Sequence, residues 1–349
     1  MKTKSKICRA FGLFILLGQL AIATGLRGQE DQALGFFPLR SQSPIQQLRF
    51  GMQHHPPWTV PQGTWALQFQ HTWKNLWLYD EQRFLIDGEI HETVLRSAYG
   101  VTDRFEVMME LPVRYLSGGV LDGLIEGFHS MLRLGQAGRD KFPRNRFAVQ
   151  ITVPDKGGST LLNRSSDSGW QVGNIVLSST YAILSDRGQK FTAIVTANMK
   201  FPTATTSEMF GSQKIDLGLS FGAGYNRRPF HLYYNAGLLY FGDRTIMGLE
   251  LRQWRFSSLL ALEYHPVGSR HSWVLQGLIE SGVARNYGQF SRRTSELVFG
   301  YKRRYTSGWV LEIGFLENLF YFDNSPDIAL HVAVTKFLTS PNRLVQIRE

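Results

Sequence analysis

The sequence predicts an all-β fold, a transmembrane antiparallel up-and-down β-barrel of about twelve strands. Three observations support this prediction. Apolar residues occupy alternate positions in segment after segment, aromatic residues recur near both ends of these segments, and short connections alternate with long ones. Alternation places the apolar side chains on one face of a strand and the small or polar ones on the other.

The clearest example is the segment 214–241. Apolar or aromatic side chains stand at every odd position from Ile215 to Tyr225 and at every even position from Phe230 to Tyr240. Pro229 fits the turn between these two runs, because proline lacks the N–H that a strand ladder requires. The same pattern recurs nearly to the C-terminus, and lipid is therefore expected to cover the apolar face.

Residues 1–28 are predicted to be a secretory signal peptide. Lys2, Lys4, Lys6 and Arg9 precede an apolar run at 11–22, and small residues follow at 21–25. An uncleaved anchor helix is the alternative, although the run is shorter than the ~20 residues that span a bilayer. The single cysteine, Cys8, lies before the apolar core, so the processed chain would have no disulfide and no thiolate metal site.

The charge balance argues against a nucleic-acid partner. The formal charge of +10 falls to about +5 when the five positive charges of residues 1–28 are removed. No basic run with interleaved aromatic residues is present, as nucleic-acid binding would require. The remaining surplus of positive charge is explained by basic residues that lie beside the anionic head groups of a membrane surface.

Residues 29–61 are predicted to form an extended N-terminal arm. Prolines at 38, 44, 56, 57 and 61 make this segment unsuitable for the interior of a sheet. The adjacent His54 and His55 could bind a metal, but neighbouring histidines on a flexible arm rarely do so specifically.

The barrel is predicted at 62–338, with a C-terminal tail at 339–349. Strands are expected near 65–74, 90–101, 105–115, 169–184, 191–201, 214–227, 230–241, 254–264, 273–283, 294–304, 309–318 and 327–338. The segment 147–153 would be a thirteenth strand, but single-chain bacterial barrels have an even number. It is therefore assigned to a long outer loop, 117–168, in which helical spacing of apolar residues predicts a helix at 120–134.

The spacing of aromatic residues favours a membrane over a soluble sandwich. Phe105 and Tyr115 are ten residues apart, and so are Trp254 and Tyr264. Ten residues at ~3.3 Å each, tilted by ~40°, cover about 25 Å, which is the height of the apolar band between the aromatic girdles of a barrel. A periplasmic β-sandwich with a binding or structural role remains the third hypothesis.

No motif predicts a catalytic, cofactor-binding or metal-binding residue. Glu126 and His129 have metal-ligand spacing on the predicted helix, but a dimetal site would need a second such pair. Gly218 to Gly222 matches Gly-x-Ser-x-Gly, yet the match lies within a strand rather than at a strand–turn–helix corner. Outer-membrane phospholipases also have twelve strands, which makes a lipid hydrolase the second hypothesis. Such an enzyme needs a lipid-facing serine, whereas parity directs Ser220 inward.

The inward-facing side chains are the candidate site. Parity directs thirteen charged residues into the lumen: Glu92, Arg96, Glu106, Glu110, Arg114, Lys200, Asp216, Arg255, Glu263, Glu280, Glu296, Lys302 and Glu312. Both signs occur, so strong selection for one ionic charge is not apparent. The alternative is that these charges only satisfy one another inside a narrow barrel, because unpaired buried charge is costly. Whether the lumen is open, or is plugged by the arm or by the loop helix, is left undecided.

Three segments carry a resemblance to a known family: the arm at 38–44, the turn at 99–106 and the helix at 121–129. With these the chain resembles domain-of-unknown-function family 3187, an uncharacterised family of Gram-negative outer-membrane barrels. The resemblance covers nearly the whole processed chain, implies the fold and the location, and supplies no catalytic residue. The chain departs from the usual barrel ending, because further residues follow Phe337.

The first hypothesis for function is therefore a non-enzymatic channel or transport-related protein for small polar solutes. The protein is expected in the outer membrane of a Gram-negative bacterium after cleavage of its signal peptide. Expected partners are membrane lipid, lipopolysaccharide and the barrel-assembly machinery. No cofactor and no nucleic acid are expected, and the oligomeric state is left open.

Overall fold

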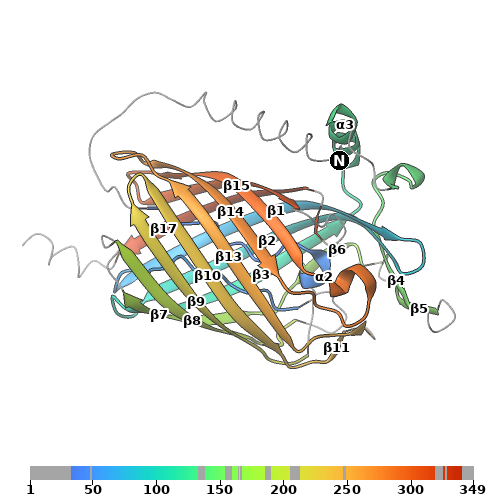
Figure 1. Cartoon of the computed structure of the whole chain (residues 1–349), viewed down its shortest axis with the longest axis horizontal. Helices are drawn as coiled ribbons and strands as arrows, with labels where there is room; N and C mark the ends of the chain where they lie inside the picture. The colour runs from blue at the N-terminus through green and yellow to red at the C-terminus, as the bar shows by residue number, and fades with distance from the viewer. Residues whose placement is uncertain are drawn as a thin grey trace, which may run out of the picture.

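Twelve antiparallel strands close into one barrel in the computed structural model (Figure 1). The structure describes residues 33–339, apart from 48, 133–137, 154–158, 164, 166, 185–189, 205–212, 247–248, 319–324 and 327. The strands of the barrel are β1 (Thr64–Asp80), β2 (Phe84–Gly100), β3 (Phe105–Ser117), β7 (Val176–Leu184), β8 (Phe191–Lys200), β9 (Asp216–Arg227), β10 (Phe230–Phe241), β13 (Trp254–Tyr264), β14 (His271–Glu280), β15 (Thr294–Arg304), β16 (Trp309–Asn318) and β17 (Ile328–Thr339). Each strand pairs with the next in this order, and β17 returns to β1, with Trp65 opposite Leu338.

The predicted fold and strand number are confirmed, and the sandwich hypothesis is wrong, because the sheet closes on itself. The segment predicted at 147–153 is β4 (Ala148–Val153), which belongs to the outer loop and pairs with β2 and with β5 (Ser159–Asn163). The predicted loop helix is α3 (Asp122–Leu132). No helix in the described part of the chain is long and apolar enough to cross a membrane.

The two faces of the wall follow the predicted parity. Leu219 is 59% exposed on the outer surface, whereas its neighbour Ser220 is 4% exposed and points inward. In the register of β9 with β10, Leu219 lies opposite Leu238, and Ser220 lies opposite Gly237. Large apolar side chains therefore cover the outside of the barrel, while small and polar ones face its interior.

One predicted strand is interrupted. The segment 169–184 consists of β6 (Gly169–Val172) and β7, and these pair with different halves of β3. The interruption lies opposite Pro112, which has no N–H to donate to a ladder. The backbone N–H of Gly173 instead donates to the carbonyl of Pro112 over 2.8 Å.

The β1–β2 hairpin extends beyond the rest of the barrel at the end with the long loops. β1 pairs with β17 only as far as Asn75, and β2 pairs with β3 only as far as Glu89. Past these residues β2 continues against β4. The sequence predicts that the first strand ends at residue 74 and that the second begins at residue 90, so the hairpin is longer than predicted. Leu76, Trp77 and Leu78 are all buried, so alternation disappears where both faces of a strand are covered.

Short elements complete the outer end. They are the hairpin β11 (Thr245–Ile246) and β12 (Leu249–Glu250), and the 3-10 turns η2 (Arg139–Lys141) and η4 (Gly288–Ser291). The arm contains one short helix, α2 (Pro44–Gln47), which lies at the end of the barrel that carries α3 and β4 (Figure 1).

Candidate functional site: the lumen and the N-terminal arm

The N-terminal arm enters the barrel at the end with the short turns. The backbone N–H groups of Leu34 and Gly35 donate to the carboxylate of Glu263 over 2.8 and 2.9 Å. Glu263 is the second-last residue of β13, next to the short connection to β14. By the loop-length rule for bacterial barrels, this is the periplasmic end.

The arm then turns at the outer end of the barrel and comes back. The amide of Gln46 in α2 donates to the carbonyl of Ser281, just beyond the outer end of β14 (3.1 Å). Farther along, the hydroxyl of Thr59 donates to the carbonyl of Asp103, in the short turn between β2 and β3 (2.8 Å). Residues 33–47 and 49–61 therefore form the two sides of a U inside the lumen, with both ends at the periplasmic end and α2 at its apex.

Apolar side chains of the arm fill the interior of the barrel. Phe36, Phe37, Leu39, Phe50 and Met52 are each no more than 2% exposed. They pack against inward-facing apolar side chains of the wall, Tyr233, Leu239, Leu259, Leu278 and Val298 among them. The arm, rather than the loop helix, therefore occupies the lumen, which answers a question that the sequence left open.

Wall carboxylates hold the arm at several levels. Glu92 receives the guanidinium of Arg40 and is also paired with Arg114 (2.6 Å) and Lys74 (3.7 Å) of the wall. Glu106 accepts the backbone N–H of Val60 over 2.6 Å and contacts Nε2 of His55 at 2.8 Å. In both cases a negatively charged carboxylate of the wall binds hydrogen-bond donors of the arm.

Glu296 holds the arm just before its apex. Its carboxylate accepts the backbone N–H groups of Gln42 and Ser43 over 2.9 and 3.0 Å and the hydroxyl of Ser41 over 2.9 Å. The hydroxyl of Ser325 also reaches it, over 3.2 Å. No lysine or arginine is paired with this carboxylate in the described part of the chain.

Wall cations hold carbonyl groups of the arm. Nζ of Lys302 donates to the carbonyl of Phe36 over 2.7 Å, and Nη2 of Arg96 donates to the carbonyl of Pro38 over 2.9 Å. Since most buried backbone groups need a partner, these bonds allow an irregular segment to lie inside the barrel. The wall therefore binds the main chain of the arm through both its donors and its acceptors.

All thirteen charged residues predicted to face the lumen are at most 8% exposed. Several form ion pairs within the wall: Arg96 with Glu110, Lys200 with Asp216 (2.8 Å), Arg255 with Glu280, and Glu312 with Lys302 (3.3 Å). Glu106, Glu263 and Glu296 instead bind the arm. That these residues line a conducting path stays a prediction.

Sequence reasoning omitted one wall cation, Lys74, from the candidate set. Its side chain is fully buried and points inward. The same parity argument that selected the other residues would have found it. The contacts of the arm had no comparable signal, because they join residues that lie far apart in the sequence, 46 positions for Val60 and Glu106 and 255 for Ser41 and Glu296.

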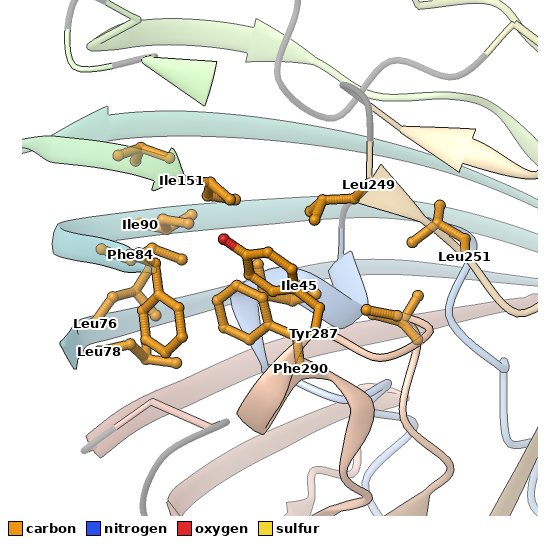
Figure 2. Close-up of a cluster of buried hydrophobic side chains, with 14 of the residues drawn as sticks. Ile45, Leu76, Leu78, Phe84, Ile90, Ile151, Leu249, Leu251, Tyr287 and Phe290 are labelled. Carbon is orange, nitrogen blue, oxygen red and sulfur yellow. The ribbon is translucent and has the colours of Figure 1, made fainter. Parts of the chain in front are cut away.

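An apolar cluster lies at the outer end of the barrel (Figure 2). Figure 2 shows Ile45 of the arm close to Tyr287 and Phe290 of the loop between β14 and β15. Phe290 stacks on Phe84 with ring centroids 4.3 Å apart. The hydroxyl of Tyr287 donates to the carbonyls of Arg83 (2.9 Å) and Thr152, and burial raises the pKa of Tyr287 to about 12. The cluster therefore joins the apex of the arm to the outer loops.

The remaining motifs lie apart from any catalytic arrangement in the described residues. Gly218 to Gly222 is in the middle of β9, and Ser220 faces the interior. His54 contacts the hydroxyl of Ser257 at 2.8 Å, and His55 binds Glu106, so the two histidines have separate partners. Glu126 pairs with Arg144, while the side chain of His129 lies outside the described residues. Within the described part, no group of three or more possible metal ligands is found.

A hollow of about 1260 Å³ lies on the outer surface of the barrel. It is lined mainly by lipid-facing side chains, including Trp65, Leu219, Leu238 and Trp254. Its position on the apolar outside separates it from the lumen.

A closed twelve-stranded barrel with an apolar, aromatic-flanked exterior and a charged interior defines the class of outer-membrane β-barrel proteins. Within that class, the chain belongs to the family of proteins of unknown function DUF3187, whose sequence pattern matches residues 20–337. The resemblance noted in the arm, the turn and the loop helix is thereby confirmed. A comparison with curated protein sequences finds no match.

Solved outer-membrane barrels have a similar fold. The COG4313 outer membrane channel from Pseudomonas putida F1 is 12% identical, aligns over 82% of this chain and 100% of its own length, and has a TM-score of 0.56. The CymD monoaromatic hydrocarbon channel is 11% identical over 80% and 90% of the two chains, with a TM-score of 0.37. The KdgM porin, in complex with disordered oligogalacturonate, is 6% identical over 78% and 98%, with a TM-score of 0.40. At these identities the likeness concerns the fold, and the last two TM-scores are too low to carry an argument.

Proposed function

We propose that this protein is a non-enzymatic outer-membrane channel for small polar solutes, and that its N-terminal arm closes it. The observation that carries the proposal is the U-shaped course of the arm through a charged lumen. Both ends of the U lie at the periplasmic end, so the arm can leave in that direction without threading through the barrel. The only cysteine of the chain is Cys8, so no disulfide ties residues 33–61 to the wall.

The wall that the arm would leave behind is suited to polar solutes. Carboxylates, amides and hydroxyls face inward around the barrel, including Asn198, Asn235 and Thr196, each no more than 3% exposed. A twelve-stranded barrel is wider than the eight-stranded barrels whose interiors side chains fill. Departure of the arm would therefore open a water-filled path. The likeness of fold to a solved outer membrane channel supports this proposal.

Conductance of the refolded protein in a planar bilayer tests the proposal. The full-length protein should be mostly closed, and a variant that lacks residues 33–58 should conduct steadily. A synthetic peptide of residues 33–61 should block the shortened variant when it is added on the short-turn side. The same peptide with Arg40→Gln is the matched control, and it should block more weakly because the ion pair with Glu92 is lost.

Two results would contradict the proposal. One is the absence of conductance from a shortened variant that still shows the heat-dependent gel mobility of a folded barrel. The other is a full-length protein that conducts as steadily as the shortened variant, since the arm would then close nothing.

A lipid hydrolase is the second candidate, and one contact favours it. Nδ1 of His71 lies 3.0 Å from the hydroxyl of Thr93, and both residues point to the lipid-facing side of β1 and β2. A hydroxyl beside an imidazole is the pairing that nucleophilic catalysis uses. No carboxylate bonds to His71 to orient its ring in the described part of the chain, so the channel stands first. Loss of a measurable lipase activity in Thr93→Ala would favour the hydrolase.

A further inference from the structure

We infer that the opened lumen selects cations and that its solutes are small organic cations with N–H donors. This inference rests on the channel proposed above and specifies its substrate class. It comes from the way the charged side chains of the wall are paired while the arm is present.

The first step is that the wall carries more carboxylates than cations. Among the described residues, the buried charged side chains that face the lumen include eight carboxylates (Glu92, Glu106, Glu110, Asp216, Glu263, Glu280, Glu296 and Glu312) and six cations (Lys74, Arg96, Arg114, Lys200, Arg255 and Lys302). The described arm contains no acidic residue and two arginines, Arg40 and Arg49. The arm therefore balances the charge of the wall, and its departure leaves a surplus of negative charge.

The second step identifies the carboxylates that carry the surplus. Each of the six wall cations is paired with a wall carboxylate: Lys74 and Arg114 with Glu92, Arg96 with Glu110, Lys200 with Asp216, Arg255 with Glu280, and Lys302 with Glu312. Glu106, Glu263 and Glu296 have no lysine or arginine partner in the described part of the chain. When the arm leaves, Glu106 loses the backbone N–H of Val60 and the imidazole of His55, and Glu263 and Glu296 each lose two backbone N–H donors. Glu263 keeps the neutral hydroxyl donors of Tyr233 and Ser272, and Glu296 keeps that of Ser325, so no lysine or arginine of the described wall replaces the arm.

The third step is the chemistry of the donors that the arm supplies. Glu263 and Glu296 each accept two adjacent backbone N–H groups, from Leu34 and Gly35 and from Gln42 and Ser43. Glu106 accepts one backbone N–H and contacts an imidazole nitrogen. An exposed carboxylate prefers a donor that is also charged, because charge-assisted hydrogen bonds are the stronger ones. A guanidinium or a primary ammonium group supplies such donors.

The fourth step is the position of these carboxylates along the barrel. Glu106 and Glu263 are near the periplasmic ends of β3 and β13, and Glu296 is near the outer end of β15. A cation that enters at either end would thus meet an unpaired carboxylate. Acidic side chains along a pore attract cations and exclude anions. The sequence alone indicated no such preference, because it could not show which charges cancel one another.

The test is the zero-current potential of the full-length protein in a gradient of potassium chloride. Phe50→Ser with Met52→Ser serves as the background, because it weakens the apolar contacts of the arm and leaves the charged wall intact. When the channel opens in this background, its zero-current potential should be shifted toward the equilibrium potential of potassium. Adding Glu263→Gln and Glu296→Gln should move it most of the way back toward zero.

The matched control neutralises an ion pair of the wall. Lys200→Gln with Asp216→Asn leaves the net charge unchanged, and it should leave the zero-current potential of the background unchanged. Glu106→Gln is a second single variant, for the case in which the double variant fails to fold. The current carried by methylguanidinium should be larger than the current carried by tetramethylammonium at the same concentration and voltage, because tetramethylammonium has no N–H donor.

Each contrary outcome has a separate meaning. Absence of conductance from every folded variant would overturn the channel itself. Conductance with a potential at zero, or shifted toward chloride, would overturn the cation preference and leave the channel standing. An unchanged potential after Glu263→Gln with Glu296→Gln would overturn the assignment to these carboxylates. Equal currents from the two organic cations would overturn the role of N–H donors.

Discussion

Arginine substitutions at Leu219 and Ser220 should both be costly, for different reasons. Leu219→Arg places a charge among lipid chains, which costs about 2–4 kcal/mol of barrel stability near the middle of a bilayer. An arginine at position 220 would cost far less in a water-filled lumen, where water can solvate its charge. The structure shows a filled lumen: a Cβ atom at Gly237 would meet the Met52 methyl of the arm and the Cβ of Ser220. Asp216, a carboxylate on the same inward face of β9, is already paired with Lys200.

The expected magnitude for Ser220→Arg follows from this packing. Inserting a large side chain into a filled interior costs about 1–3 kcal/mol. A buried charge without a partner costs about 3–5 kcal/mol. We therefore expect a loss of at least about 4 kcal/mol in the free energy of unfolding, equal to or larger than that of Leu219→Arg.

The assay is denaturant unfolding of both variants in the same lipid vesicles, followed by tryptophan fluorescence. In a background that lacks residues 33–58, the cost of Ser220→Arg should fall well below that of Leu219→Arg, because water then surrounds the new side chain. The cost of Leu219→Arg should not change. If Ser220→Arg costs under about 1 kcal/mol in the full-length protein, less than overpacking alone predicts, then the arm does not fill the lumen.

Three further predictions concern the membrane, the chemistry and the outer cluster. The protein should fractionate with the outer membrane and change its gel mobility on boiling, and recovery as a soluble periplasmic protein would end the barrel account. Ser220→Ala should leave any lipase activity unchanged, because the hydroxyl faces away from lipid; loss of a robust activity would revive the hydrolase. Phe290→Ala should destabilise the outer cluster by about 3–5 kcal/mol and speed protease cleavage of the outer loops. Val120→Ala, at a position 71% exposed, is its control and should leave the cleavage rate unchanged.

The strands and their faces could be predicted because their signals are local. Alternation from Ile215 to Tyr225 decides which side of β9 meets lipid, and the register with β10 then follows from a short turn. Counting strands by parity also placed the segment at 147–153 in the outer loop, where β4 lies. Such signals need no knowledge of the rest of the chain.

The closed state of the lumen could not be predicted in this way. The prolines of the arm exclude it from a sheet, but they do not indicate what the arm packs against. Its position depends on contacts such as Leu34 with Glu263 and Ser41 with Glu296, which join distant parts of the chain. Apolar side chains such as Phe36, Phe37 and Phe50 are a local sign that the arm has an apolar partner, but they do not say which part of the chain that partner is.

Amide hydrogen exchange of the arm tests the central claim most directly. In the full-length protein folded in lipid vesicles, the backbone N–H groups of Leu34, Gly35, Gln42 and Ser43 are bonded to buried carboxylates. Peptides from residues 33–61 should therefore exchange slowly, at rates that approach those of the barrel strands. Exchange of these peptides at the rate of an unstructured chain, with the strands still protected, would show that the arm lies outside the lumen.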